Sequence, residues 1–312
     1  MQARTRRLGD RIGDVALRVL TGAAALGCIG LVGWIVYEIF ELAWPAITEE
    51  GLSFVWQTTW DPVHEVFGAF DFIFGTLYTS FWALLIAAPI SVAIGLYLSE
   101  LAPAGVRGIV GTLVEMLAAV PSVVIGLWGI LVLGPVVKDY IGPALGAVLG
   151  WTPFFKGTPG DVGQLSAVIV LSIMIIPITS SISRELFLTV PPDLKEAAFG
   201  LGLTRWEMVR GVVLPFTRSG VFAAIILGLG RALGEAIAVT QVIGNRQGVN
   251  WSLFETGDTL ASRLANTFYG ASSALEKSSL AYLGAILLVI TLVANIGAQL
   301  IVYRFDPLRE RK

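Results

Sequence analysis

The sequence predicts an all-α membrane protein with six transmembrane helices. Of its 312 residues, 55% are hydrophobic and only 14% are charged, and the mean hydropathy is +0.77. A typical soluble domain has about 45–50% apolar and about 25% charged residues, so this chain has too little charge to cover a water-facing surface. The apolar content also excludes intrinsic disorder. Membrane β-strands would alternate over segments of about ten residues, and no such alternation is present.

Six long apolar stretches provide the predicted helices, because a helix needs about 20 apolar residues to cross the core of a bilayer. Five contain no Asp, Glu, Lys or Arg, and they cover residues 19–37, 72–99, 116–137, 162–183 and 278–303. The sixth, residues 219–245, is equally apolar but includes Arg231 and Glu235. Kinks, serving either curved packing or a hinge, are expected at the three prolines inside these stretches, Pro89, Pro121 and Pro177.

The positive charges predict the orientation of the helices. If the N-terminus is cytoplasmic, the cytoplasmic segments contain 15 of the 21 Lys and Arg residues, and the segments on the opposite side contain 5. The remaining one, Arg231, lies within the membrane. Cytoplasmic loops of membrane proteins carry such an excess of positive charge, so both termini are expected in the cytoplasm.

This topology divides the chain into five segments. They are a cytoplasmic N-terminal tail (1–18), a first transmembrane helix (19–44), an external loop (45–71), a core of five transmembrane helices (72–303) that includes a cytoplasmic loop at 184–218, and a cytoplasmic C-terminal tail (304–312). The first apolar stretch is too long for a cleavable signal peptide, so a retained helix is expected. Residues 136–161 are rich in Gly and Pro and predict turns, and residues 259–268 predict one short surface helix.

Composition excludes several classes of function. The net charge of −2 offers no basic surface for nucleic acid. A single cysteine, Cys28, and a single histidine, His64, cannot form an internal disulfide or a metal cluster, so no metal or cofactor is expected. No Gly-x-x-x-x-Gly-Lys-Ser/Thr phosphate loop is present, so this chain is expected not to hydrolyse ATP and not to be an enzyme.

The loop at 184–218 predicts two short helices joined by a glycine turn. Pro191, Pro192 and Asp193 fit the start of the first helix, and Gly200 and Gly202 fit its end. The second helix is expected to run from Arg205 to Leu214 and to be closed by Pro215. Small side chains at Ala197 and Ala198 would permit a partner to approach closely.

The same loop resembles the signature of the permeases of ATP-driven (ABC) importers. The resemblance rests on a pattern of fixed spacing, Glu196-Ala197-Ala198, Gly202, Val212 and Leu214-Pro215, in which Val212 replaces the usual isoleucine. It implies the type I ABC importer permease fold, with Glu196 to Gly202 as a cytoplasmic coupling helix that sits in a groove of an ATP-hydrolysing subunit. The alternative is a loop that packs only on its own helices.

The two charges in the fifth predicted helix suggest a substrate site. Arg231 and Glu235 are four residues apart, which places them on nearly the same helix face and within reach of a salt bridge. Buried membrane charges usually face a bundle interior or a water path. Our hypothesis is that Arg231 faces a path for an oxyanion and that Glu235 tunes it; the alternative is an ion pair that locks helices together. Thr76 and Ser80 offer hydroxyls either to the anion or to neighbouring helices.

Further motifs resemble the phosphate-specific permeases of this family. They are residues 230–235 (GRALGE), 67–69 (FGA), 75–76 (GT), 115–122 (EMLAAVPS) and 126–129 (GLWG). Asp71 stands where proline is expected. The resemblance implies an importer of inorganic phosphate in the inner membrane, assembled with a second permease subunit, two ATP-binding subunits and a periplasmic phosphate-binding protein. The second permease would supply a further arginine to a shared pathway.

Three other functions remain open. A permease for another oxyanion, such as sulfate or molybdate, would keep the loop signature from Glu196 to Pro215 but not the motif at Arg231. A secondary transporter would use Arg231 and Glu235 for proton-coupled anion transport, but it predicts inverted repeats, which the sequence does not show. A purely structural membrane subunit predicts that neutralising Arg231 is harmless.

Overall fold

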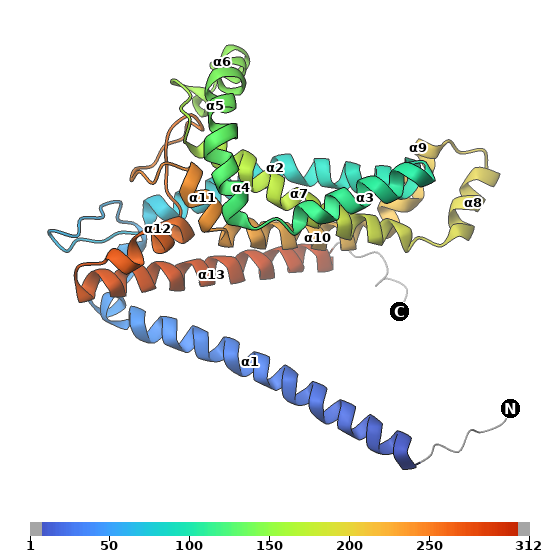
Figure 1. Ribbon diagram of the computed structural model, residues 1–312, viewed down its shortest axis with the longest axis horizontal. Coiled ribbons are helices and arrows are strands. Elements are labelled where there is room, and N and C mark those ends of the chain that lie inside the picture. The colour runs from blue at the N-terminus through green and yellow to red at the C-terminus, as the bar shows by residue number, and fades with distance from the viewer. Residues whose placement is uncertain (1–7, 305–312) are drawn as a thin grey trace.

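The computed structural model describes residues 8–304, and this part of the chain contains helices and loops but no extended sheet (Figure 1). The α-helices are α1 (Leu8–Glu50), α2 (Phe70–Leu96), α3 (Ala104–Ala118), α4 (Ser122–Trp128), α5 (Gly134–Val136), α6 (Gly142–Leu149), α7 (Gln164–Leu188), α8 (Pro192–Gly200), α9 (Arg205–Met208), α10 (Leu214–Gly234), α11 (Ile237–Val242), α12 (Leu260–Thr267) and α13 (Ala274–Arg304). Short 3-10 helices lie at Gly51–Val55, Pro153–Phe155 and Phe268–Gly270.

The predicted number of membrane-spanning segments is confirmed. Six helical segments of the described chain are long and apolar enough to cross a membrane: Gly13–Val55, Phe70–Leu101, Ser122–Leu149, Gln164–Leu188, Arg205–Gly234 and Ala274–Leu300. The first helix is longer than predicted at both ends, because α1 includes residues 8–18 of the expected tail and continues to Glu50. The rest of both predicted tails lies outside the described residues.

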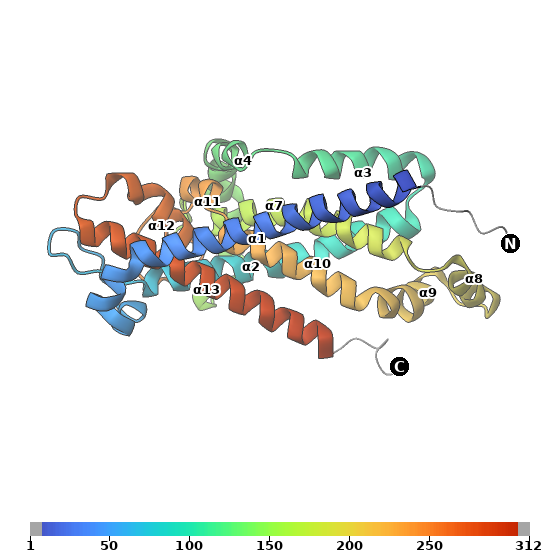
Figure 2. The same cartoon turned by 90° about the horizontal axis from the view of Figure 1, so that it is seen from below.

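Helix α7 forms the centre of the bundle, with α2 and α10 packed along it (Figures 1 and 2). Small and hydroxyl-bearing side chains allow the backbones to approach closely. The Ser172 hydroxyl of α7 donates to the Ala83 carbonyl of α2 at 3.2 Å. A Cβ atom on Gly95 of α2 would lie 3.1 Å from the backbone nitrogen of Arg184. Such contacts hold helices together in lipid, where the hydrophobic effect between helices is absent.

Helix α1 stands apart from most of the bundle. It contacts α13 near its C-terminal end, where Ala43 and Ala46 are fully buried, and the Ala46 amide donates to the Ser278 hydroxyl at 2.8 Å. Towards its N-terminal end α1 diverges from the other helices (Figure 1), and side chains such as Leu26 and Trp34 are exposed. This length of α1 therefore faces lipid or another membrane protein.

The prediction of one continuous helix over residues 116–137 is wrong. Helix α3 ends at Ala118, and α4 begins at Ser122 after an extended Pro121 (φ −58°, ψ 138°). Pro121 lacks the N–H that a continuous helix requires and disfavours helical backbone at Val120. Figure 1 shows α3 lying along the bundle, whereas α4 to α6 extend away from it.

Three other prolines, Pro135, Pro143 and Pro215, lie in continuing helix just after a π-helical turn, whereas the helix that includes α2 ends before Pro103. The π turns are Tyr97–Leu101, Gly129–Leu133, Val137–Ile141 and Val209–Val213, and each is followed two residues later by a proline. A proline ring collides with the preceding turn of an α-helix, and a wider turn relieves the collision. The turns predicted near Gly142 are therefore wrong, since the helix continues to Leu149. Pro215 likewise lies in the first turn of α10 and does not close the second loop helix.

The predicted helix at 259–268 is confirmed as α12, which is exposed at Ala265 and Asn266 but buried at its first turn. Thr259 caps α12 by accepting a hydrogen bond from the Ser262 amide at 3.1 Å, and the first turn is buried. The chain before α12 crosses α2 at Gly75, where a Cβ atom would overlap the Asp258 carbonyl oxygen. Glycine is required there by close backbone approach.

We expect Gly75→Ala to destabilise the fold. The added methyl group must displace the Asp258 backbone, and overpacking of this kind costs about 1–3 kcal/mol. Thermal unfolding in detergent would show a lower midpoint than for the wild type. The matched control is Gly30→Ala in α1, where no atom lies within 4 Å of the added methyl group. Equal midpoints for the two variants would contradict the proposed contact.

Candidate functional site

The fifth predicted helix is broken at the position of its two charges. Helix α10 ends at Gly234, Glu235 has an extended backbone (φ −76°, ψ 114°), and α11 begins at Ile237. The prediction of one helix over residues 219–245 is therefore wrong. Irregular backbone at membrane depth is tolerated only where protein or a water-filled cavity satisfies it. Broken helices of this kind commonly form the substrate sites of transporters.

Arg231 lies in the last turn of α10 and is partly buried. The predicted salt bridge with Glu235 is wrong, because the described chain contains no ion pair between them. The i, i+4 geometry requires a continuous helix, and the extended Glu235 instead accepts a weak hydrogen bond from the Ala238 amide at 3.4 Å. The free carbonyl groups at the end of α10 favour a cation at Arg231.

Several side-chain donors of the described residues are buried without a partner, among them Arg231 Nε, Ser80 Oγ on α2 and Thr179 Oγ1 on α7. Thr179 lies against α10 one turn before Arg231, since a Cβ atom on Gly228 would be 2.8 Å from its hydroxyl oxygen. Buried donors are normally satisfied, so the unpaired donor of Arg231 beside the break leaves a place for a further acceptor. Sequence reasoning identified Ser80 but not Thr179, because a lone threonine in an apolar stretch carries no local signal.

Thr76 has a different role from Ser80. Its hydroxyl donates to the Phe72 carbonyl at 2.7 Å and accepts a hydrogen bond from the Leu260 amide at 2.9 Å. These contacts correspond to the second of the two predicted roles, hydrogen bonding between elements. Thr76 holds the start of α12 against α2.

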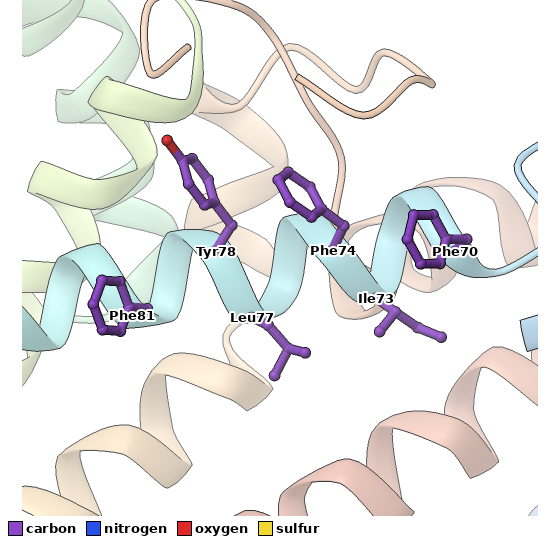
Figure 3. A pocket seen from close by; sticks show the side chains of 6 residues that line it. All are labelled: Phe70, Ile73, Phe74, Leu77, Tyr78 and Phe81. Carbon is purple, nitrogen blue, oxygen red and sulfur yellow. The ribbon is translucent and has the colours of Figure 1, made fainter. Parts of the chain in front are cut away.

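One hollow on the surface of α2 does not suit an anion. A depression of about 320 Å³ is lined by Phe70, Ile73, Phe74, Leu77, Tyr78 and Phe81 (Figure 3). Its lining has no charged side chain, and the Tyr78 hydroxyl donates to the Trp251 carbonyl. This surface of α2 is therefore an apolar contact face, separate from Arg231.

The second candidate site, the loop at 184–218, lies at one end of the bundle. Figures 1 and 2 place α8 at that end and α12 at the opposite end. Glu196 and Ala197 are exposed on α8, and Gly202 (φ +81°) makes the turn that leads to α9. Ala198 is only 4% exposed and packs inside the chain, so the expectation that it meets a partner is wrong.

Leu214 also packs against the buried cluster beneath α8, whereas Pro215 is exposed at the start of α10. The two short helices also carry exposed apolar side chains, here called the apolar rim: Leu194, Phe199 and Leu201 on or at the end of α8, and Trp206 on α9. Exposed apolar groups beside a charged helix are typical of a protein interaction site. Sequence reasoning missed this apolar rim, because exposure depends on how α8 lies on α9.

At the opposite end, a buried ion pair anchors α12. Arg263 Nη1 lies 3.8 Å from Asp258 Oδ2, and its guanidinium carbon lies 5.2 Å from the ring centres of both Trp60 and Phe72. Burial raises the pKa of Asp258 to about 6, while Arg263 and the Thr259 amide partly oppose this shift. Burial also lowers the pKa of Arg263, so desolvation outweighs the attraction of the pair.

Comparison with known proteins identifies the family. Residues 91–311 match the family described as binding-protein-dependent transport system inner membrane component. The chain belongs to this family. A relative in Pasteurella multocida, the phosphate transport system permease protein PstC, is 43% identical over 100% of this chain and 98% of its own length. The protein of the same name in Haemophilus influenzae is 44% identical over 92% of each chain.

Solved structures of two ABC transporters share the fold. A bacterial alginate ABC transporter in complex with an alginate-bound periplasmic protein matches with a TM-score of 0.63 at 18% identity, covering 95% of this chain and 98% of that chain. An inward-facing MetNI methionine ABC transporter matches with a TM-score of 0.58 at 16% identity, covering 79% and 99%. The predicted permease fold of an ABC importer is thereby confirmed. This family member is a multi-pass membrane protein.

The buried carboxyl group predicts a pH dependence of stability. In the unfolded chain Asp258 ionises near its ordinary pKa, about 3.9, whereas in the folded chain it ionises near 6. The folded state therefore binds more protons between these values, and its stability falls as pH rises from about 4 to 6. The loss is no more than about 3 kcal/mol.

Thermal unfolding measured across this pH range would test the effect. Asp258→Asn keeps the shape of the side chain but cannot ionise. The loss of stability between pH 4 and 6 should therefore be smaller than in the wild type. The exposed Asp193→Asn provides a control that should leave the profile unchanged. An identical pH profile for Asp258→Asn and the wild type would contradict the raised pKa.

Proposed function

We propose that this chain is the permease subunit of an ATP-driven importer of inorganic phosphate and that it forms half of the translocation pathway. The observation that carries this proposal is Arg231, a permanent cation with an unpaired donor at the break between α10 and α11. Relatives that are 43% and 44% identical bear the name phosphate transport system permease. The names of these relatives are the reason to propose phosphate as the substrate, and the break between α10 and α11 is where we propose that it binds.

The chemistry of the site suits a small oxyanion. A guanidinium cannot lose its proton in a protein and presents a planar set of donors that matches phosphate oxygens. The hydroxyl groups of Ser80 and Thr179 add neutral donors. Glu235, next to the break and not paired with Arg231, lowers the net positive charge so that phosphate can leave as well as enter. A homologous second permease subunit would supply the other half of the pathway.

The loop at 184–218 is proposed to couple this pathway to ATP hydrolysis. Glu196 and Ala197 on α8, with Gly202 and the apolar rim, would dock in a groove of an ATP-binding subunit. The chain has no phosphate loop of its own, so two ATP-binding partner subunits would hydrolyse the nucleotide. Closure of those partners would move α8 and switch the pathway between its two openings.

The proposed orientation follows from the charges. Both termini and α8 would face the cytoplasm, and α12 would face the periplasm, as the excess of Lys and Arg at the termini and in the loop at 184–218 indicates. A periplasmic phosphate-binding protein would then deliver its anion at the α12 end. The complex would lie in the inner membrane.

Uptake measurements would test the role of Arg231. In the complete complex reconstituted into vesicles, Arg231→Gln is expected to reduce ATP-dependent uptake of radiolabelled phosphate about 10- to 100-fold, the effect of losing one charged hydrogen bond. Arg231→Lys keeps the charge but not the planar donors, so its uptake rate should lie between those of the wild type and Arg231→Gln. Lys277→Gln, an exposed charge on α13, is the control.

Normal uptake by an assembled Arg231→Gln complex would overturn the proposed site. Competition by sulfate or molybdate that matches competition by phosphate would instead support a permease for another oxyanion. Uptake without ATP would support a secondary transporter.

Docking of α8 is tested separately from transport. Ala197 is exposed, so Ala197→Trp should leave the fold intact but fill the space that a partner requires. We expect this variant to lose at least about 90% of the ATP-binding subunit that co-purifies with the wild type, since a clash at the centre of an interface costs more than 1.4 kcal/mol. Ala265→Trp on α12, also exposed, should retain the partner. Full retention by Ala197→Trp would exclude α8 as the docking helix.

A further inference from the structure

A buried ion pair joins α8 to the end of α2. Lys195 Nζ of α8 lies 2.6 Å from Glu100 Oε1, in the π-helical turn Tyr97–Leu101 that follows α2. The side chains are only 19% and 8% exposed, respectively. The two residues are 95 positions apart in the sequence, so the contact belongs to the tertiary structure.

Glu100 also connects to the elements on either side of α8. Its backbone carbonyl accepts a hydrogen bond from Arg205 Nη1, at the start of α9, at 3.4 Å. Lys195 Nζ donates to the Phe187 carbonyl, near the end of α7, at 3.4 Å. A small cavity of about 140 Å³ adjoins the pair. Four helices, α2, α7, α8 and α9, therefore meet at this one pair.

An ion pair is not the most stabilising contact that could hold α8 in place. Removing two charges from water costs several kcal/mol, and apolar side chains of similar size would pack as well or better. The attraction between fixed charges does, however, define one direction and one length for the contact. An ion pair of this kind passes a displacement of α8 to α2 more directly than a smooth apolar interface would, because helices can slide along an apolar interface.

Neighbouring residues of α8 point to different sides of the helix. Lys195 reaches inward to Glu100 and Ala198 is buried, whereas Glu196 and Ala197 are exposed to a partner. A force applied at Glu196 and Ala197 therefore reaches Lys195 through a single helical turn. The exposed face and the ion pair form opposite sides of one short, stiff element.

Helix α2 carries the contact towards the candidate substrate site. From Glu100 to Ser80 the chain rises about 30 Å at 1.5 Å per residue. Along this length α2 packs closely on α7, through Gly95 against Arg184 and through Ala83 against Ser172. Close packing lets the pair of helices move as one body. The π turn at Glu100 is a local irregularity of the kind that is frequent at functional sites.

We infer that Glu100 and Lys195 are positioning residues that transmit movement of α8 to α2 and so couple ATP hydrolysis to phosphate movement. This inference rests on the proposed function of α8 and the pathway. The inference adds two residues that lie outside both the loop signature and the Arg231 motif. It also assigns α2, rather than α10 alone, as the helix to which movement of α8 is passed.

The experiment compares transport with ATP hydrolysis in the complete reconstituted complex. Glu100→Gln is expected to keep at least half of the wild-type rate of ATP hydrolysis but to reduce phosphate imported per ATP at least about fivefold. Glu100→Lys combined with Lys195→Glu restores a pair of opposite charges and should recover at least half of the wild-type ratio. The matched control is Lys138→Met, which removes an exposed ion pair of 3.1 Å with Asp161 and should leave the ratio unchanged.

A second variant separates coupling from folding. Glu100→Gln combined with Lys195→Met leaves no buried charge unpaired, so the complex should assemble, as judged by co-purification of the ATP-binding subunits, and should remain uncoupled. A wild-type ratio in this neutral variant, an unchanged ratio in Glu100→Gln, or failure of the reversed pair to restore the ratio in an assembled complex would each overturn the inference. Absence of ATP-dependent phosphate uptake by the wild type would instead refute the proposed function itself.

Discussion

Close backbone contact between α2 and α7 is the constraint on which the other features depend. Lipid surrounds the bundle, so apolar side chains gain nothing by moving from lipid to a neighbouring helix, and association depends on fit and on polar contacts. Gly95 and Ser172 provide both at the α2–α7 interface. Because these two helices are held so closely, they form a rigid frame that can move as one body and around which less regular elements can be arranged.

One of those irregular elements is the break between α10 and α11. A continuous helix would satisfy its own backbone, and an isolated interruption in lipid would be costly. Here α10 lies on α7, and α11 is anchored by the buried side chains of Ala238, Val239 and Val242, while Gly234 and Ile237 at the break itself are exposed. The α2–α7 frame thereby supports a break at which Arg231 and the extended Glu235 lie at the end of the membrane-spanning segment Arg205–Gly234, and this is the position of the proposed phosphate site.

The two ends of the molecule are stabilised in different ways. At the α12 end, Arg263 lies against two aromatic rings and beside a buried carboxyl group, and Gly75 allows the preceding loop to lie directly on α2. At the α8 end, a buried lysine and glutamate connect a short helix whose outer face is exposed and partly apolar. The first arrangement fixes a loop within the chain. The second leaves the outer face of α8 exposed while joining this helix to the bundle.

The sequence by itself determined the features that depend on neighbouring residues. Apolar runs placed the six spans, proline and glycine placed both ends of α8, and spaced motifs placed the chain in its family. Only the tertiary structure decided that Pro121 ends a helix whereas Pro215 does not, because π turns depend on the packing around them. It also separated Arg231 from Glu235 and brought Glu100 to Lys195. Contacts between residues that are far apart in the sequence arise from the whole fold, and the spacing of residues along the chain does not reveal them.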